Sequence, residues 1–317
     1  MSYSLSLPLF SRKRAWLFAF VAVWAFVIFS QNNVGALLQE YGFFTFVGIV
    51  GAVFANATGA GGGVVFVPFF AYLSFTPDSI VATSFAIQCC GMTAGAITWT
   101  RFFCAQRQTD QRKIDSQWGA LPGALLLTVI PSLCGVLFSQ YTTHGSVLLL
   151  NVLGGPENLH TVFGVFSVIL AIAIIASIPL MKRQVFSNAL AGNDIVCLPT
   201  IAFLGGCITA WLSIGVGELV AVYLIIRGFN VTMSIAVAVI LSAFTVWSAL
   251  PFHVLVSHAI VYDVVIFAGA GAILGGVMAK YLVLAFSTQS LKLFFGLWVF
   301  LLGVTSLPIF NVFLYVA

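Results

Sequence analysis

The sequence predicts an all-α polytopic membrane protein that forms a single membrane domain over residues 1–317. Of these residues, 61% are apolar and only 6% are charged, whereas a soluble domain carries roughly 25% charged residues. The apolar residues form runs that match or exceed the ~20 residues of a membrane-spanning helix. Two runs are too long for one span and contain glycine clusters. These observations predict about seven full transmembrane helices plus two glycine-broken, re-entrant helical hairpins.

Each apolar run is expected to be helical, because a helix satisfies its own backbone hydrogen bonds in lipid. The runs cover about 15–37, 42–75, 79–104, 118–139, 160–181, 195–227, 231–256, 259–286 and 290–316. The first run follows Arg12, Lys13 and Arg14, which resembles the start of a signal peptide. No A-x-A-like cleavage site follows cleanly, so we expect a retained first helix.

The runs 42–75 and 195–227 are the overlong ones. As straight helices they would be about 50 Å long at 1.5 Å per residue, against a hydrocarbon core of ~30 Å. The first contains a glycine cluster at 59–63, and the second contains one at 215–217. Because glycine is a weak helix former, each run is expected to break at its cluster.

The distribution of Lys and Arg decides how these two runs cross the membrane. With the basic residues 12–14 in the cytoplasm, single crossings would place six of the twelve Lys and Arg residues outside, whereas hairpins place all twelve inside or at the inner interface. The hairpins then enter from opposite faces. Units 15–139 and 160–286 form an inverted-topology repeat, and 290–316 is an extra C-terminal helix. The N-terminus is predicted to be cytoplasmic and the C-terminus outside a cell (inner) membrane.

The two breaks supply groups that can bind an anion. A half-helix N-terminus carries free N–H donors and partial positive charge, so two of them near the midplane can hold a small anion. Neutral polar residues add donors, and Trp211 could wall the cavity. The predicted substrate-binding residues are Asn56, Thr58, Gly59, Gly61, Gly62, Gly63, Thr83, Ser84, Gln88, Trp211, Ser213, Gly215, Gly217 and Ser242. Alternatively, the glycines serve close helix packing, and Ser and Thr bond to their own helices.

Glu218 is the one acidic residue in the deep apolar part of a segment. A carboxylate inside the membrane is costly, and burial favours its neutral form. We therefore predict a proton-coupling group that is protonated while an anion is bound. The alternative is a carboxylate stabilised by a half-helix N-terminus.

What the sequence lacks argues against several classes of function. No catalytic constellation and no ATP-binding loop are present, so we expect neither an enzyme nor a cofactor. The cysteines show no CxxC spacing, and His253, His258 and Asp263 lack an evident fourth ligand, so no metal site is expected. Without a contiguous basic face, nucleic-acid binding is not expected. The expected partners are a small anion and the lipid bilayer, and a homodimer is one open option.

Two stretches resemble a known family. Residues 56–68 read NATGAGGGVVFVP and residues 81–88 read VATSFAIQ, which resembles the sulfite exporter TauE/SafE family over about 40–316. The resemblance implies a permease with two glycine-rich motifs in inverted halves. It also implies export of sulfite, sulfoacetate and related one- and two-carbon sulfur compounds across the inner membrane. The second motif, SIGVGELVAVYL at 213–224, departs from the family pattern by placing Glu218 where small or apolar residues are usual.

Residues and resemblance together predict a secondary transporter, an exporter of sulfite or a related sulfur oxoanion or organosulfonate. Three alternatives stay open. The first is an anion channel with the same site, and the second is an uptake permease for thiosulfate or a small organic acid. The third is a membrane sulfur-handling enzyme that uses Cys89 or Cys90.

Overall fold

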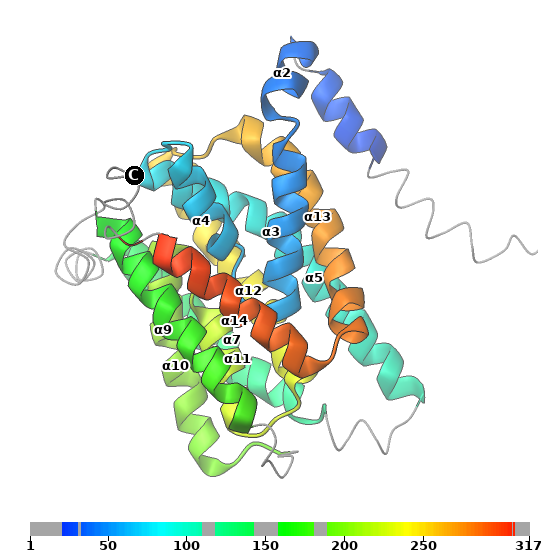
Figure 1. Ribbon diagram of the computed structural model, residues 1–317, viewed down its shortest axis with the longest axis vertical. Helices are drawn as coiled ribbons and strands as arrows, with labels where there is room; N and C mark the ends of the chain where they lie inside the picture. The colour runs from blue at the N-terminus through cyan, green and yellow to red at the C-terminus, as the bar shows by residue number, and fades with distance from the viewer. Residues whose placement is uncertain are drawn as a thin grey trace, which may run out of the picture.

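The computed structural model describes residues 21–30, 33–109, 118–142, 158–180, 189–305 and 307. Within these residues the regular secondary structure is helical (Figure 1), which confirms the predicted all-α class. In chain order the helices are Val21–Phe29, α2 Val34–Tyr41, α3 Phe44–Thr58, α4 Gly63–Tyr72, α5 Pro77–Thr109, α7 Ala120–Tyr141, α9 Leu159–Leu180, α10 Gly192–Leu212, α11 Val216–Ile226, α12 Val231–Phe252, the π-helix η3 His253–Ser257, α13 Tyr262–Ala285 and α14 Thr288–Thr305.

Five of the described helices are long and apolar enough to cross a membrane, namely α5, α7, α10, α12 continued by η3, and α13. This confirms a polytopic membrane protein. The predicted first helix, 15–37, is not one straight element, since Val21–Phe29 and α2 form a pair bent by 116°. The bend falls between Phe29 and Val34. The count of about seven full spans stays a prediction.

Both overlong runs break at their predicted glycine clusters. The first helix of the first run, α3, ends at Gly59, which has a left-handed φ of 80°. In the second run, the break between α10 and α11 contains Ser213 at φ 60° and Gly215 at φ 141°. Glycine adopts positive φ without a steric penalty, whereas a residue such as serine pays roughly 1–2 kcal/mol. A serine in this position therefore needs side-chain contacts that compensate for the strain.

Each broken run folds back as a hairpin. In the first, Phe44 at the start of α3 contacts Phe69 and Phe70 near the end of α4, with ring centroids 6.1 Å apart in both pairs. In the second, Asp194 at the start of α10 is 2.8 Å from Arg227, the residue after α11. The α3–α4 hairpin opens toward the upper end of Figure 1 and α10 and α11 lie toward the lower end. The inverted repeat over units 15–139 and 160–286 stays a prediction, because both units include residues outside the described ranges.

Each of the two units packs a helix of its hairpin against a helix of the other unit. The most extensive contacts join α3 to α13 and α10 to α7, so the first helix of each hairpin packs on the last full helix of the other unit. Glycines permit the close approach: a β-carbon at Gly271 or Gly275 would collide with the backbone of α3. Gly135 and Gly206 play the same part between α7 and α10. Small residues at interfaces are how membrane helices gain packing without a hydrophobic driving force.

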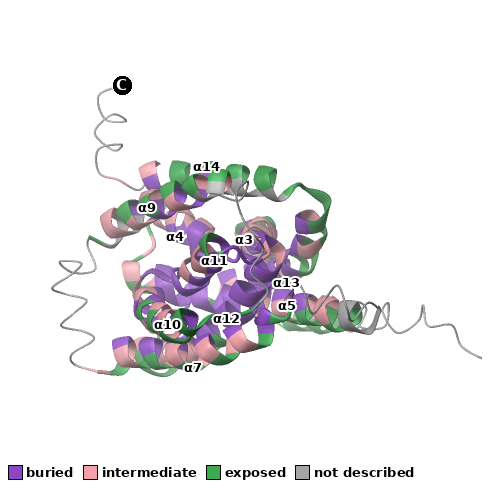
Figure 2. Cartoon of the chain, turned by 90° about the horizontal axis from the view of Figure 1, so that it is seen from below, coloured by how far each residue is buried: buried purple, intermediate pink, exposed green. Residues whose placement is uncertain are grey.

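The breaks lie in the centre of the bundle. Seen from below, α4, α11, α12 and the middle of α5 are mostly buried, whereas α7, α9, α10 and α14 expose their outer faces (Figure 2). The exposed side chains are apolar, including Leu126, Ile169 and Val196, as expected of surfaces that face lipid. The hairpin ends are therefore shielded from lipid by protein, which irregular backbone in a membrane requires.

Candidate functional site

The two helix breaks touch each other directly. A β-carbon at Gly63 would lie 2.6 Å from the carbonyl oxygen of Ser213, and one at Gly61 would lie 3.0 Å from the same atom. From the other side, a β-carbon at Gly217 would overlap the carbonyl oxygen of Gly59. The backbones thus approach to distances that only glycine allows. Here the predicted glycines serve both the break and the contact between the two hairpins.

The Glu218 carboxylate bridges the two breaks. The Gly61 N–H donates to Oε1 at 2.6 Å, and the Gly215 N–H donates to Oε2 at 2.8 Å. The side chain is buried, with 3% of its surface exposed. Gly61 precedes α4 and Gly215 precedes α11, so the carboxylate is held by the N-terminal donors of both half-helices. This is the alternative interpretation of Glu218 given above, and the proton-coupling role stays a prediction.

Gln88 joins the same two breaks from α5. Its Oε1 accepts from the Gly62 N–H at 2.8 Å. Its amide nitrogen donates to the Ser213 hydroxyl at 2.7 Å, and it lies 3.2 Å from the Ser213 carbonyl and 3.0 Å from the Ser84 hydroxyl. The Ser213 hydroxyl in turn donates to Ser84 at 3.0 Å. These contacts hold Ser213 in its left-handed conformation.

A small cavity lies beside the carboxylate. It has a volume of about 10 Å³ and is lined by residues of both breaks and of α12, which is room for about one water molecule. Ser242 on α12 lines it, and its hydroxyl is buried without a hydrogen-bond partner among the described residues. A buried hydroxyl is normally paired. Ser242 is therefore a free polar group that faces the site.

The structure gathers most of the predicted binding residues around this cavity. Its lining includes Gly61, Gln88, Ser213, Gly215, Gly217, Glu218 and Ser242. Gly62 and Ser84 belong to the same hydrogen-bond network through Gln88, and Gly59 and Gly63 lie at the contact between the breaks.

Four predicted residues do not line the cavity, although Thr58 lies at the first break, where its hydroxyl accepts from the Ala60 N–H at 3.1 Å. The Asn56 amide donates to the carbonyl of Ala52 in its own helix at 2.8 Å and to the carbonyl of Gly91 on α5 at 3.3 Å, and Thr58 donates to the carbonyl of Phe54 at 2.7 Å. Thr83 accepts from the Val261 N–H at 3.1 Å. Trp211 is packed against the apolar core. Side chains such as Asn56 and Thr58 can satisfy nearby backbone groups, and sequence alone does not separate that use from ligand binding.

Thr209 is a residue of this site that the sequence prediction missed. Its hydroxyl accepts from the Val216 N–H at 2.9 Å and lines the cavity. It thereby caps α11 from inside α10, in place of a side chain at the usual cap position. The available signal was its spacing: Thr209 lies one helical turn before Ser213, on the same face of α10.

The Asp194 cluster is a second feature that the prediction missed. Asp194 is fully buried and accepts from the Tyr223 hydroxyl at 2.6 Å, from Arg227 Nε at 2.8 Å and from the Ala191 N–H at 2.8 Å. It closes the open end of the second hairpin. A hairpin with its two ends on one face brings residues 194 and 227 together, so the pairing was accessible once the hairpin was predicted.

Replacing Asp194 with asparagine is expected to loosen this hairpin. The variant loses the ion pair but retains its shape, and the side chain of Arg227 is 38% exposed, so water moderates the loss to about 1–2 kcal/mol. Thermal unfolding in detergent measures the effect, and Asp263→Asn, on the first turn of α13, is the matched control. Equal melting temperatures for the two variants would show that the cluster does not hold the hairpin.

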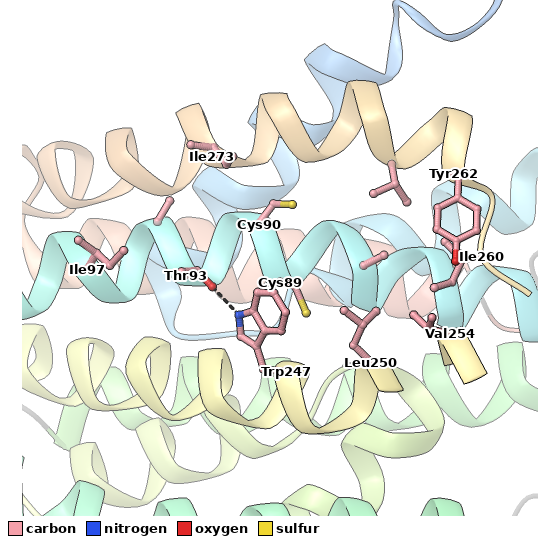
Figure 3. A pocket seen from close by; sticks show the side chains of 13 residues that line it. Cys89, Cys90, Thr93, Ile97, Trp247, Leu250, Val254, Ile260, Tyr262 and Ile273 are labelled. Carbon is pink, nitrogen blue, oxygen red and sulfur yellow. Dashed lines mark hydrogen bonds between the residues drawn. The ribbon is translucent and has the colours of Figure 1, made fainter. Parts of the chain in front are cut away.

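Cys89 and Cys90 face a different cavity. Figure 3 shows both on α5, with Trp247 of α12 donating its indole N–H to the Thr93 hydroxyl at 2.8 Å. This cavity has a volume of about 470 Å³ and an almost wholly apolar lining. A reactive thiol needs a neighbouring cation or base, and the described residues that line this cavity include no Lys, Arg or His. The arrangement gives no support to cysteine chemistry.

Comparison with known proteins adds one match. The family described as "Sulfite exporter TauE/SafE" matches residues 44–306. The matched segment begins with the first residue of α3 and extends past α14, so it contains both helix breaks. No curated protein and no solved structure gives a significant match.

Proposed function

The chain belongs to the sulfite exporter TauE/SafE family, and from that premise we propose that it is a secondary transporter that exports sulfite or a closely related sulfur oxyanion. Membership of this family and its apolar helices make it a multi-pass membrane permease. The finer proposal concerns the substrate, the site and the mechanism. The substrate site lies between the two helix breaks, near the middle of the membrane.

One observation carries the proposal: an anionic group is already bound there by both half-helix N-termini. The N–H groups of Gly61 and Gly215 hold the two oxygens of the Glu218 carboxylate. Such donors bind oxyanions without a buried cation. A sulfite ion presents oxygens of the same chemical kind and comparable spacing. The cavity lining also includes the neutral polar side chains of Gln88 and Ser242, which could orient a substrate.

Transport would proceed by alternating access. The cavity is too small for a sulfite ion, so the bundle has to rearrange before the site opens to either side. Two opposed hairpins that meet at one site provide such a mechanism, since rocking one unit against the other exposes the site to each face in turn. A closed site between two movable halves favours a carrier over an open channel.

Further parts of the proposal concern coupling and placement. Glu218 takes up a proton while the anion is bound, which would couple transport to the proton gradient. The protein resides in the inner membrane with its N-terminus in the cytoplasm, as the positions of Lys and Arg favour. A homodimer is compatible with its exposed apolar faces.

Flux into proteoliposomes tests the proposal. We expect the purified protein to move sulfite, more slowly sulfoacetate and thiosulfate, and least of all acetate and sulfate. External sulfite should accelerate the exit of labelled sulfite, because a carrier exchanges substrates and an open channel does not. Unchanged leakage of all five anions relative to empty liposomes would overturn the proposal. Preferential movement of acetate or thiosulfate would support the uptake alternatives instead.

A further inference from the structure

We infer that the Glu218 carboxylate is a tethered occupant of the anion site, which a substrate oxyanion must displace in order to bind. This rests on the proposed function and adds a competition between the chain's own anion and the transported one. In the resting state the chain's own carboxylate fills the site, and protonation of Glu218 controls whether the site is free for substrate.

The first step is that the donors are already in use. At the two half-helix starts, the N–H groups of Gly61, Gly62, Gly215 and Val216 each have a side-chain acceptor. The neutral side chains of Gln88 and Thr209 accept from Gly62 and Val216. The Glu218 carboxylate accepts from Gly61 and Gly215. A substrate oxyanion that binds the Gly61 and Gly215 N–H groups has to take both of them from the Glu218 carboxylate.

The second step is that there is no room for both anions. The cavity beside the carboxylate has a volume of about 10 Å³, which is room for about one water molecule, whereas sulfite has four heavy atoms. The carboxylate therefore has to leave the position that the substrate takes.

The third step is that the displaced Glu218 carboxylate has a polar partner nearby. The Ser242 hydroxyl lines the same cavity, is 3% exposed and has no hydrogen-bond partner among the described residues. Gly217 has no side chain to separate Ser242 from the first turn of α11. When the Glu218 side chain turns away from Gly61 and Gly215, its carboxylate can accept a hydrogen bond from the Ser242 hydroxyl. This gives the unpaired hydroxyl a use that the resting state does not show.

The fourth step identifies Glu218 as the group that titrates at the site. The helices α9, α10 and α12 pack against α11, and α5 lines the cavity through Gln88. The titratable and charged residues of these elements, of α11 and of the residue after it are His160, Asp194, Cys197, Cys207, Tyr223, Arg227 and, on α5, Asp78, Cys89, Cys90, Arg101, Cys104 and Arg107. Asp194, Tyr223 and Arg227 bond to one another at the far end of the hairpin. Cys207 donates to Gly135 of α7, and Cys89 faces the apolar cavity. Among the described residues that line the small cavity, Glu218 is the one ionisable residue.

Two consequences follow. Deprotonated Glu218 competes with substrate, so sulfite affinity falls as the pH rises through the titration of this group. In addition, the Gly61 and Gly215 N–H groups point at two separate oxygens. The site therefore selects anions with two oxygens on one centre, and a halide binds weakly.

Equilibrium binding of sulfite to the detergent-purified full chain, between about pH 5.5 and about pH 8.5, tests the inference. The variants are Glu218→Ala, which removes the competitor, and Glu218→Asp, which keeps the charge on a side chain too short to reach both N–H groups. Glu40→Gln, at an exposed position, is the control. Taking each variant's Kd relative to wild type at the same pH cancels the titration of sulfite itself.

At the alkaline end, Glu218→Ala should bind sulfite at least about tenfold more tightly than wild type, and the difference should shrink toward the acidic end. Glu218→Asp should resemble Glu218→Ala, whereas simple charge repulsion would leave it like wild type and overturn the inference. Equal or weaker sulfite binding by Glu218→Ala at every pH would overturn it too. Chloride should not compete in any variant.

Stability provides a second readout that does not depend on a well-behaved alanine variant. Sulfite should raise the melting temperature of Glu218→Gln more than that of wild type, because the Gln side chain leaves one of the two N–H groups without an acceptor. An equal or smaller rise than in wild type would contradict the inference. If wild type and Glu40→Gln neither bind nor move sulfite, the proposed function fails. If both do so while the Glu218 variants show no gain, this inference alone fails.

Discussion

Replacing Gly217 with alanine is expected to eliminate more than about 90% of sulfite flux and to lower the free energy of unfolding by about 2–3 kcal/mol. The added methyl group would overlap the Gly59 carbonyl oxygen and the Ser242 hydroxyl. The first of these is backbone of the opposite hairpin and cannot rotate away. The two breaks would be forced apart at the point where they share the Glu218 carboxylate.

The matched control for this substitution is Gly192→Ala. Gly192 begins α10, and a β-carbon there meets nothing within 4 Å. Flux in proteoliposomes and thermal unfolding are measured on both variants at equal reconstitution. The packing argument is wrong if Gly217→Ala transports and melts like Gly192→Ala.

Replacing Gln88 with methionine should lower the free energy of unfolding by about 2–4 kcal/mol and abolish transport. Methionine has nearly the same shape but cannot pair with Gly62, Ser84 or Ser213. The Gly62 N–H would then be buried without an acceptor, and Ser213 would lose the contacts that compensate for its left-handed backbone.

Gln140→Met is the control that shows how much stability is lost when a partly buried glutamine outside the site is replaced by methionine. Gln140 lies on α7 and makes two long contacts, at 3.4 Å to the Ala249 carbonyl and at 3.3 Å to His253. We expect its replacement to lower the free energy of unfolding by less than about 1 kcal/mol. Similar losses of stability at positions 88 and 140 would argue against a special role for Gln88.

The sequence was most informative where a physical rule acts locally. Run length and glycine content located both breaks, and the positions of Lys and Arg predicted hairpins, as now seen between Phe44 and Phe69 and between Asp194 and Arg227. The glycine-rich motif also indicated the family that the comparison finds.

The sequence was least informative about partners. Gln88 and Ser213 are 125 positions apart, and no local pattern shows that one would support the strained backbone of the other. Asn56 and Gln88 looked alike as polar residues near a break, yet Asn56 bonds to the backbone carbonyls of Ala52 and Gly91 and does not line the small cavity. Which of two such amides reaches the site depends on helix rotation and on neighbouring units. These are set by packing that a single sequence does not specify.

The bond between Gly61 and Glu218 also has a consequence for how the protein is made. Its two residues are separated by 157 positions, which at 5–20 residues per second corresponds to roughly eight to thirty seconds of translation. The first hairpin therefore enters the membrane before the residue that completes it has left the ribosome. Until then its Gly61 N–H must be satisfied by water or by the insertion machinery. The N-terminal unit matures only when the C-terminal unit arrives.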